Sequence, residues 1–276
     1  MRKVLNINRK WAFRKGVSAV PAEVPADWDF VNLPHTWNAI DGQDGGNDYY
    51  RGTCMYVKTL DREEIPAADR YYLELNGANS SADVYVNGEK LAHHDGGYST
   101  WRVEITDQLK KGTRIAVAVD NAENDRVYPQ MADFTFYGGL YRDVNLIAVS
   151  NSHFDLVYYG GPGIAVTPTV NGDKADVEIE TYLTDIKAGQ TIKYTVLDKA
   201  GNSVATAETA ADSPKVTVEI PKVHLWNGRK DPYLYTAVAE LCEGDKVLDN
   251  ISARFGCRTF KIDPEKGFFL NGVSYP

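Results

Sequence analysis

Short stretches in which apolar and polar residues alternate are the feature that most constrains the fold of this chain. Such runs recur from one end to the other, as in Ala82–Val86 and Val216–Ile220, and turn residues separate them. No long segment keeps the helical repeat of about 3.6 residues. Because successive side chains of a strand point to opposite faces, this alternation indicates half-buried strands. The sequence therefore predicts an all-β fold.

The clearest local signal in the first half is Asn87-Gly88, which lies between the alternating runs 82–86 and 89–92. Asn-Gly favours a type I′ turn, because both residues tolerate positive φ. A further strand is expected at 71–75, and the alternation over 103–109 predicts another, which a basic turn separates from 115–119. These strands predict a jelly-roll β-sandwich over residues 1–150.

The second half is set off by the polar segment Ser150–Ser152. Strands are expected beyond it at 175–183, 191–197, 216–220 and 233–241, with Gly, Asn, Asp and Pro turns between them. A segment of about 110 residues with such strands suits an immunoglobulin-like sandwich, which we assign to residues 151–261. Glu178 and Glu180 are expected to face solvent from such strands. The hairpin-like pattern over 267–276 ends without a partner, as if the chain were interrupted.

Composition narrows the range of partners. The 276 residues are 43% hydrophobic and 25% charged, enough for two sandwich cores. A net charge of −8 opposes binding to nucleic acid and to anionic membranes, and no stretch reaches the roughly 20 apolar residues of a membrane span. Cys54, Cys242 and Cys257 are odd in number and widely spaced, so buried free thiols are expected. Cytoplasmic, periplasmic and secreted locations all stay open.

One loop carries groups that suit a sugar. The segment 42–48 is rich in glycine but lacks the Lys-Ser/Thr of a phosphate-binding loop. It can be a plain flexible loop, yet Asn47, Asp48 and the two tyrosines after them offer hydrogen bonds and stacking surfaces. We therefore keep Asn47 and Asp48 as candidate substrate-binding residues at the rim of a pocket.

Signatures of catalysis and of metal binding are not found in the sequence. His93 and His94 are adjacent on an expected strand, so they point to opposite faces and cannot easily share one ion. Hydrolysis of a glycoside needs two carboxyl groups about 5–9 Å apart, and no pair is marked out for that work. We predict no catalytic residue, no metal site and no cofactor in this chain.

Several passages together resemble the front part of family 2 glycoside hydrolases. The entry to the sugar-binding jelly roll is resembled by Leu33–Trp37 together with Tyr49–Lys58. The closing signature of that domain is resembled by Asp133–Val144. Passages of the immunoglobulin-like domain are resembled by Leu225–Tyr235 and Phe255–Arg258. Their order and spacing cover nearly the whole chain. Residues 262–276 resemble the lead-in to the catalytic TIM barrel of the family, which the chain does not include.

The resemblance assigns roles to a few residues. In the family, the two catalytic glutamates lie on barrel strands and the mechanism retains anomeric configuration, so neither can be named here. Asp133 lies where the first domain of the family sends a carboxylate into the active site to bind sugar hydroxyls, and the resemblance also brings Asn47 and Asp48 near that pocket. Without the family, Asp133 would be read as a turn residue. Arg142 and Asp143 are expected to form an internal ion pair.

The expected function is that of a scaffold and pocket rim in a retaining hydrolase of terminal β-galactosides, because the passage 130–139 looks like that branch. A β-glucuronidase, a β-mannosidase and a free-standing carbohydrate-binding or adhesive module are the alternatives. The expected partners are a β-linked carbohydrate, the chain's own C-terminal catalytic barrel and, as an open possibility, a second copy of the chain. The 276 residues alone are expected to be inactive.

Overall fold

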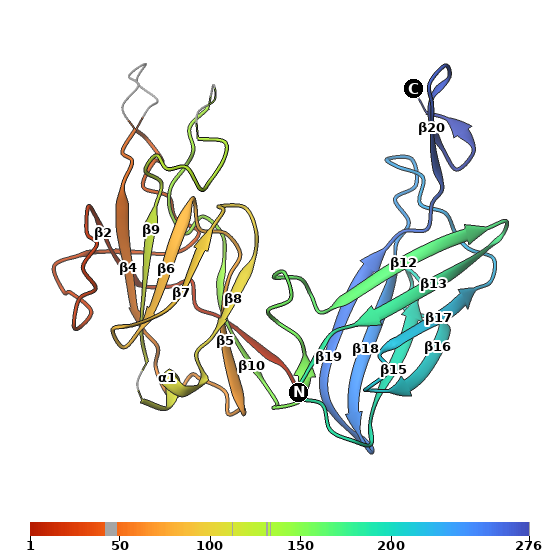
Figure 1. Ribbon diagram of the computed structural model, residues 1–276, viewed down its shortest axis with the longest axis horizontal. Helices are drawn as coiled ribbons and strands as arrows, with labels where there is room; N and C mark the ends of the chain where they lie inside the picture. Colours follow the sequence, from red (N-terminus) through yellow and green to blue (C-terminus); the bar gives the residue numbers. More distant parts are fainter. Residues whose placement is uncertain (42–48, 112, 131, 133, 276) are drawn as a thin grey trace. The chain divides into compact units, whose positions relative to one another are not determined.

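The computed structural model describes residues 1–41, 49–111, 113–130, 132 and 134–275, and it is built almost entirely of strands (Figure 1). The all-β prediction is confirmed. The chain divides into two compact units: Lys3–Val149, and Ser150–Pro276 together with Met1–Arg2. Each unit is a sandwich with its own apolar core.

The first unit packs a six-stranded sheet, in the order β3-β2-β4-β9-β6-β7, against a four-stranded sheet, in the order β1-β10-β5-β8. The strands are β1 (Lys3–Asn6), β2 (Trp11–Lys15), β3 (Asp29–Val31), β4 (Thr53–Thr59), β5 (Arg70–Leu75), β6 (Ser81–Val86), β7 (Glu89–Asp95), β8 (Trp101–Glu104), β9 (Arg114–Asp120) and β10 (Val144–Val149). All neighbours are antiparallel. Trp11 and Val117 from one sheet and Leu73 and Leu146 from the other share the core.

Two local predictions in this unit have different outcomes. Asn87 and Gly88 join β6 to β7 with φ of 53° and 89°, as a type I′ turn requires. The strand expected over 103–109 is wrong, because β8 ends at Glu104 and the helix α1 (Thr106–Lys111) follows. Ile105 and Leu109 are four residues apart, a spacing that puts two side chains on one face of a strand and also on one face of a helix. Both are buried, and the Leu109 amide donates to the Ile105 carbonyl at 3.0 Å, as in a helix.

The second unit has a three-stranded sheet, in the order β12-β13-β17, and a four-stranded sheet, in the order β16-β15-β18-β19. Their strands are β12 (Ile164–Asn171), β13 (Lys174–Thr181), β15 (Gln190–Leu197), β16 (Ser203–Ala210), β17 (Lys215–Ile220), β18 (Tyr235–Glu243) and β19 (Lys246–Phe255). A short pair, β11 (His153–Phe154) and β14 (Leu183–Thr184), and a final sheet of β20 (Phe260–Asp263), β21 (Gly267–Leu270) and β22 (Val273–Ser274) complete the unit.

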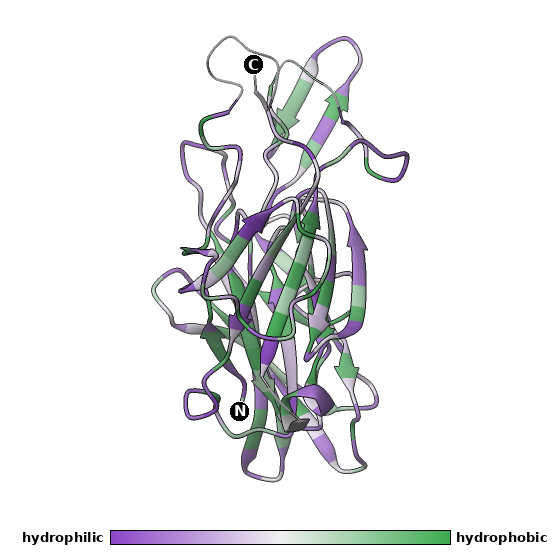
Figure 2. Ribbon diagram, turned by 90° about the vertical axis from the view of Figure 1, so that its left-hand side faces the viewer, coloured by the Kyte–Doolittle hydropathy of each residue, from purple (hydrophilic) through white to green (hydrophobic). Residues whose placement is uncertain are grey.

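Hydropathy follows the pleat of these strands. Green and purple bands alternate along the strands in Figure 2. In β13, Ala175, Val177 and Ile179 are buried, whereas the residues between them are half-exposed. This alternation is what allows one face of a sheet to bury a core while the other meets solvent.

A buried ion pair fixes the start of the chain to the second unit. Asp249 is fully buried in β19 and accepts hydrogen bonds from Arg2 Nε at 3.1 Å and Nη2 at 2.8 Å. The Phe154 amide also donates to Asp249 at 2.9 Å, and Arg2 Nη2 donates to the Phe154 carbonyl at 2.9 Å. These bonds offset the cost of burying the carboxylate.

Three further expectations can be compared with the structure. Cys54, Cys242 and Cys257 are buried free thiols, as expected. The ion pair expected between Arg142 and Asp143 is wrong: Arg142 donates to the carbonyls of Asn76 and Tyr98, and Asp143 accepts from the Asn8 side chain at 2.7 Å. The described residues include no helix with the length and apolarity needed to cross a bilayer.

Candidate functional site

The candidate site is the end of the first unit where two long loops meet. Asn47 and Asp48 on one loop, and Asp133 on the other, lie outside the described residues. The structure does describe the segments that flank them, 38–41 and 49–52 on the first loop, and 121–130 and 134–139 on the second.

Asn38 is the centre of a buried hydrogen-bond network that joins the two loops. Its side chain is fully buried, and its Oδ1 accepts from the Gly138 amide at 2.8 Å and from Asn121 Nδ2 at 3.2 Å. Its Nδ2 donates to Asp41 Oδ2 and to the Tyr50 carbonyl, each at 3.0 Å. A buried amide with all of its bonds made holds its neighbours in one arrangement.

Asn121 extends this network to the end of β9. It is 1% exposed, and its Oδ1 accepts from the Gly52 amide at 3.0 Å. Arg51 donates through Nε to the Asn121 carbonyl at 2.9 Å and reaches the Gln130 carbonyl at 3.4 Å. The Gln130 side chain accepts in turn from the Asn124 amide at 2.8 Å. Arg51 and Asn121 thus anchor the second loop on the first.

Two adjacent glycines let the loops approach closely. A Cβ on Gly138 would lie 2.1 Å from Cζ2 of Trp37, and one on Gly139, whose φ is +128°, would lie 2.5 Å from the His35 carbonyl oxygen. Thr36 Oγ1 donates to the Gly138 carbonyl at 2.7 Å. Only glycine fits at both positions. The two passages that suggest the family in sequence therefore pack against each other.

His35 is a structural member of this region. Its Nδ1 lies 2.7 Å from the hydroxyl oxygen of Tyr56, and its ring packs against the edge of Phe13 at 4.7 Å between centroids. Burial, with a smaller effect from Lys15, lowers the pKa of His35. The imidazole is therefore neutral at neutral pH, which suits a packing role.

Aromatic rings lie exposed beside the second loop. Phe134 is 60% exposed and Tyr137 is 46% exposed, and the Phe134 ring leans on Phe136 at 4.9 Å between centroids. Exposed aromatic faces next to hydrogen-bonding groups are what a sugar ring needs, because one face of a pyranose is apolar and its rim is polar. The arrangement can position a sugar, but no acid and base pair for hydrolysis is evident in the described segments.

The two adjacent histidines lie elsewhere, on β7. His93 Nδ1 lies 2.6 Å from Asp83 Oδ1, and its Nε2 lies 3.1 Å from Asp95 Oδ2. His94 stacks on Trp101 at 4.9 Å between ring centroids. The two rings thus have separate partners, and the described residues hold no cluster of three or more side chains that could bind a metal ion.

Two antiparallel sandwiches that follow each other along the chain define the class as an all-β protein with a jelly-roll domain followed by an immunoglobulin-like domain. The family model for the sugar-binding domain of glycosyl hydrolases family 2 matches residues 5–150, and the model for glycosyl hydrolases family 2 matches residues 162–258. The chain belongs to glycosyl hydrolase family 2.

The similar proteins include both β-glucuronidases and a β-galactosidase. The chain is 35% identical to a β-glucuronidase of Bacteroides fragilis over all of its own length and 40% of the relative's. It is 29% identical to the β-galactosidase BoGH2A of Bacteroides ovatus over 98% of the chain and 33% of the relative. The crystal structure of an FMN-binding β-glucuronidase from Facaelibacterium prausnitzii L2-6 matches with a TM-score of 0.92 and 40% identity, covering 100% of the chain and 42% of that structure.

Asn38 and Asn121 are the residues that sequence reasoning missed. Asn38 directly follows the Trp37 passage, and Asn121 comes directly after an apolar strand. Polar residues at such places are usually turn formers, so only their position beside recognised motifs could have drawn attention to them. Their burial depends on contacts between segments far apart in the chain.

Replacing Asn121 should test whether the network holds this end together. Asn121→Ala leaves the Gly52 amide without its acceptor and removes one of the two hydrogen bonds to Asn38 Oδ1, so we expect the free energy of unfolding to fall by about 2–3 kcal/mol. The measurement is urea unfolding followed by tryptophan fluorescence. Asn6→Ala, at an exposed position of β1, is the control and should cost no more than about 0.5 kcal/mol. Equal losses would contradict the assigned role.

His93 should make stability depend on pH. Its hydrogen bond with Asp83, and then the interactions with Asp95, raise its pKa above the ordinary value of 6.5. The protonated ring is thus favoured in the folded state, so its contribution is complete below about pH 6.5 and is lost as the pH rises through the raised pKa. His93→Gln should therefore destabilise the chain at about pH 5.5 and have little effect at about pH 8.5.

His94→Gln is the matched control for this pH dependence. Burial lowers the pKa of His94, so the neutral ring is favoured in the folded state and the sign is reversed. The stabilising contribution of His94 relative to glutamine should therefore grow as the pH rises from the lowered pKa of the folded state to the ordinary value of 6.5. Thermal unfolding of both variants at several pH values measures the two trends, and parallel trends would refute the assignment.

Proposed function

We propose that this chain forms the non-catalytic front part of a longer family 2 glycoside hydrolase and supplies the rim of its active site. The chain spans 40% of the length of the Bacteroides fragilis relative and 32% of the next one, which leaves room in those proteins for a catalytic domain. Retaining hydrolysis needs two carboxyl groups about 5–5.5 Å apart, and we assign these to that further domain.

The observation that carries this proposal is the Asn38–Asn121 network, because it joins the described segments that flank Asn47, Asp48 and Asp133 in the sequence. We propose that Asp133 accepts hydrogen bonds from two sugar hydroxyls, and that Asn47 and Asp48 contact the same sugar. Charge-assisted bonds of this kind are strong and directional, so they orient the scissile bond. This chain then contributes positioning, and the bond is broken elsewhere.

We propose β-glucuronides as the first candidate substrate. The relatives of 35% and 40% identity cited above are both named β-glucuronidases, which favours that sugar. β-Galactosides, the substrate expected from the passage 130–139, are the second candidate, supported by the relative from Bacteroides ovatus. The two sugars differ in the configuration of the C4 hydroxyl and at C6, where a glucuronide carries a carboxylate that needs a cationic or hydrogen-bonding partner.

A hydrolysis panel on the full-length protein tests the proposal. We expect release of p-nitrophenol from the β-glucuronide or the β-galactoside, with one preferred at least about tenfold, because a site built to bind a C6 carboxylate rejects a sugar that lacks it. The 276-residue chain alone should release none. Turnover by this chain alone, or none by the full-length protein on any β-glycoside, would overturn the proposal.

Asp133→Ala in the full-length protein tests the substrate-binding role. Losing the carboxylate should lower kcat/KM by about 10²-fold, because the sugar is then poorly oriented, while the melting temperature stays nearly unchanged. Asp143→Ala, an exposed carboxylate of the same passage that accepts from Asn8, is the matched control and should keep activity. A collapse of stability with normal kinetics of the residual folded enzyme would instead show that Asp133 is structural.

A further inference from the structure

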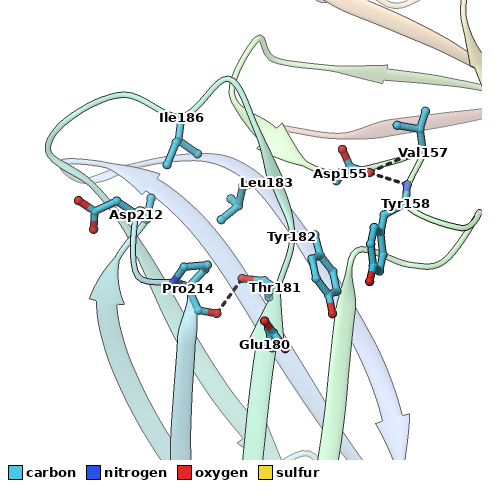
Figure 3. Close-up of a pocket in the computed structure, with 11 residues that line it drawn as sticks. Asp155, Val157, Tyr158, Glu180, Thr181, Tyr182, Leu183, Ile186, Asp212 and Pro214 are labelled. Carbon is cyan, nitrogen blue, oxygen red and sulfur yellow. Dashed lines mark hydrogen bonds between the residues drawn. The ribbon is translucent and has the colours of Figure 1, made fainter.

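A cavity opens on the second unit, and neither of the two loops of the candidate site contributes to it (Figure 3). Its volume is about 510 Å³, which is within the range of small-ligand sites. Strand β13, the loop after β11 and the turn before β17 contribute its walls. Its lining includes the side chains of Tyr158, Glu180, Tyr182, Leu183, Asp212 and Pro214. The proposed front-module function uses none of them.

One wall is a fixed aromatic pair. Tyr158 and Tyr182 stack with centroids 4.2 Å apart and planes inclined by 23°. Tyr158 is held by Asp155, whose Oδ1 accepts from the Tyr158 amide at 2.6 Å and whose Oδ2 accepts from Thr184 at 2.8 Å. Because one face of Tyr182 rests on Tyr158, its other face remains for a ligand in the cavity that both residues line.

The opposite wall is apolar and equally fixed. Pro214 and Leu183 lie across from the tyrosines in Figure 3. The Pro214 carbonyl accepts from the hydroxyl of the buried Tyr194 at 2.8 Å, and Thr181 Oγ1 lies 2.9 Å from that same hydroxyl. The polar groups of this wall are thus paired inward. What the wall offers the cavity is an apolar surface, and little ordering is needed on binding.

The charge of the cavity is negative. Glu180 and Asp212 belong to its lining, and among the described residues that line it there is no lysine, arginine or histidine. Lys215, which lies opposite Glu180 on β17, forms its salt bridge with Glu178 at 2.9 Å and interacts with Glu180 only through the longer-range attraction of their charges. No hydrogen bond to the Glu180 side chain is present within the described segments, so its oxygens can accept from a ligand.

We propose that this cavity binds a neutral saccharide. A pyranose ring lays its apolar face on Tyr182, and its hydroxyls donate to the carboxylates of Glu180 and Asp212. Both features are needed: stacking alone would suit any flat apolar molecule, whereas carboxylate acceptors select a ligand rich in hydroxyl donors. The same carboxylates repel a uronate. The site is therefore complementary to uncharged sugar units and differs in charge preference from a glucuronide-binding pocket.

Titration of the 276-residue chain with oligosaccharides tests this inference without interference from a catalytic pocket. The probes are cellotetraose, xylotetraose, β-1,4-galactotetraose and, as the anionic comparison, tetragalacturonate, followed by calorimetry and by tyrosine signals in NMR. We expect at least one neutral tetrasaccharide to bind, and to bind about tenfold more tightly than the uronate, because the carboxylates oppose a second negative charge. The result is independent of whether the full-length protein hydrolyses glucuronides.

Variants localise the binding. Tyr182→Ala should weaken it about tenfold, the scale of one lost stacking contact, and Glu180→Gln should weaken it less but reduce the discrimination against the uronate. Tyr98→Ala, which removes a tyrosine of the first unit that is 57% exposed and outside the lining, and Glu208→Gln on β16 are the controls and should bind normally. No binding of any neutral probe, preference for the uronate, or unchanged affinity in Tyr182→Ala would each overturn the proposal.

Discussion

The hydrogen bond between the buried side chains of Asn121 and Asn38 is the contact on which the candidate active-site rim depends. It joins the end of β9 to the segment after Trp37, and through Gly138 and Tyr50 it reaches both long loops. A primary amide suits this place because it donates twice and accepts twice without carrying a charge that burial would penalise. The described segments on either side of the two loops are therefore held together by hydrogen bonds at their bases.

The sequence allowed the family to be recognised because the passages that suggest it have a packing role. Trp37 leaves no room for a side chain at Gly138, and the His35 carbonyl leaves none at Gly139. Because only glycine meets such a steric requirement, these positions form short motifs that can be recognised in the sequence. The amide network could not be predicted in the same way, since Asn38 and Asn121 are ordinary turn residues until the fold buries them. The expected rim residues themselves stay predictions.

The spacing of apolar residues does not by itself determine the local structure or the surroundings of a side chain, as two segments show. Over 103–109 the buried pair Ile105 and Leu109 satisfies both a strand and a helix, and tertiary packing decided for the helix. In β13 the alternation correctly separates buried from outward residues, so Glu180 was expected to face solvent. It does lie on the outward face, but Tyr158 and Pro214, which come from other segments, line the same cavity as Glu180. No local pattern could have indicated this.

The two proposed contacts would affect catalysis differently. A carboxylate at position 133 would bind the hydroxyls of the sugar whose glycosidic bond breaks. The hydrogen bonds of this carboxylate could then strengthen as the sugar ring distorts toward the transition state. A sugar stacked on Tyr182, in a separate unit, would be held equally well before and during reaction. Uniform binding of that kind lowers KM without raising kcat. On these two proposals, the rim would affect the chemical step, and the cavity would affect the capture of longer, uncharged chains.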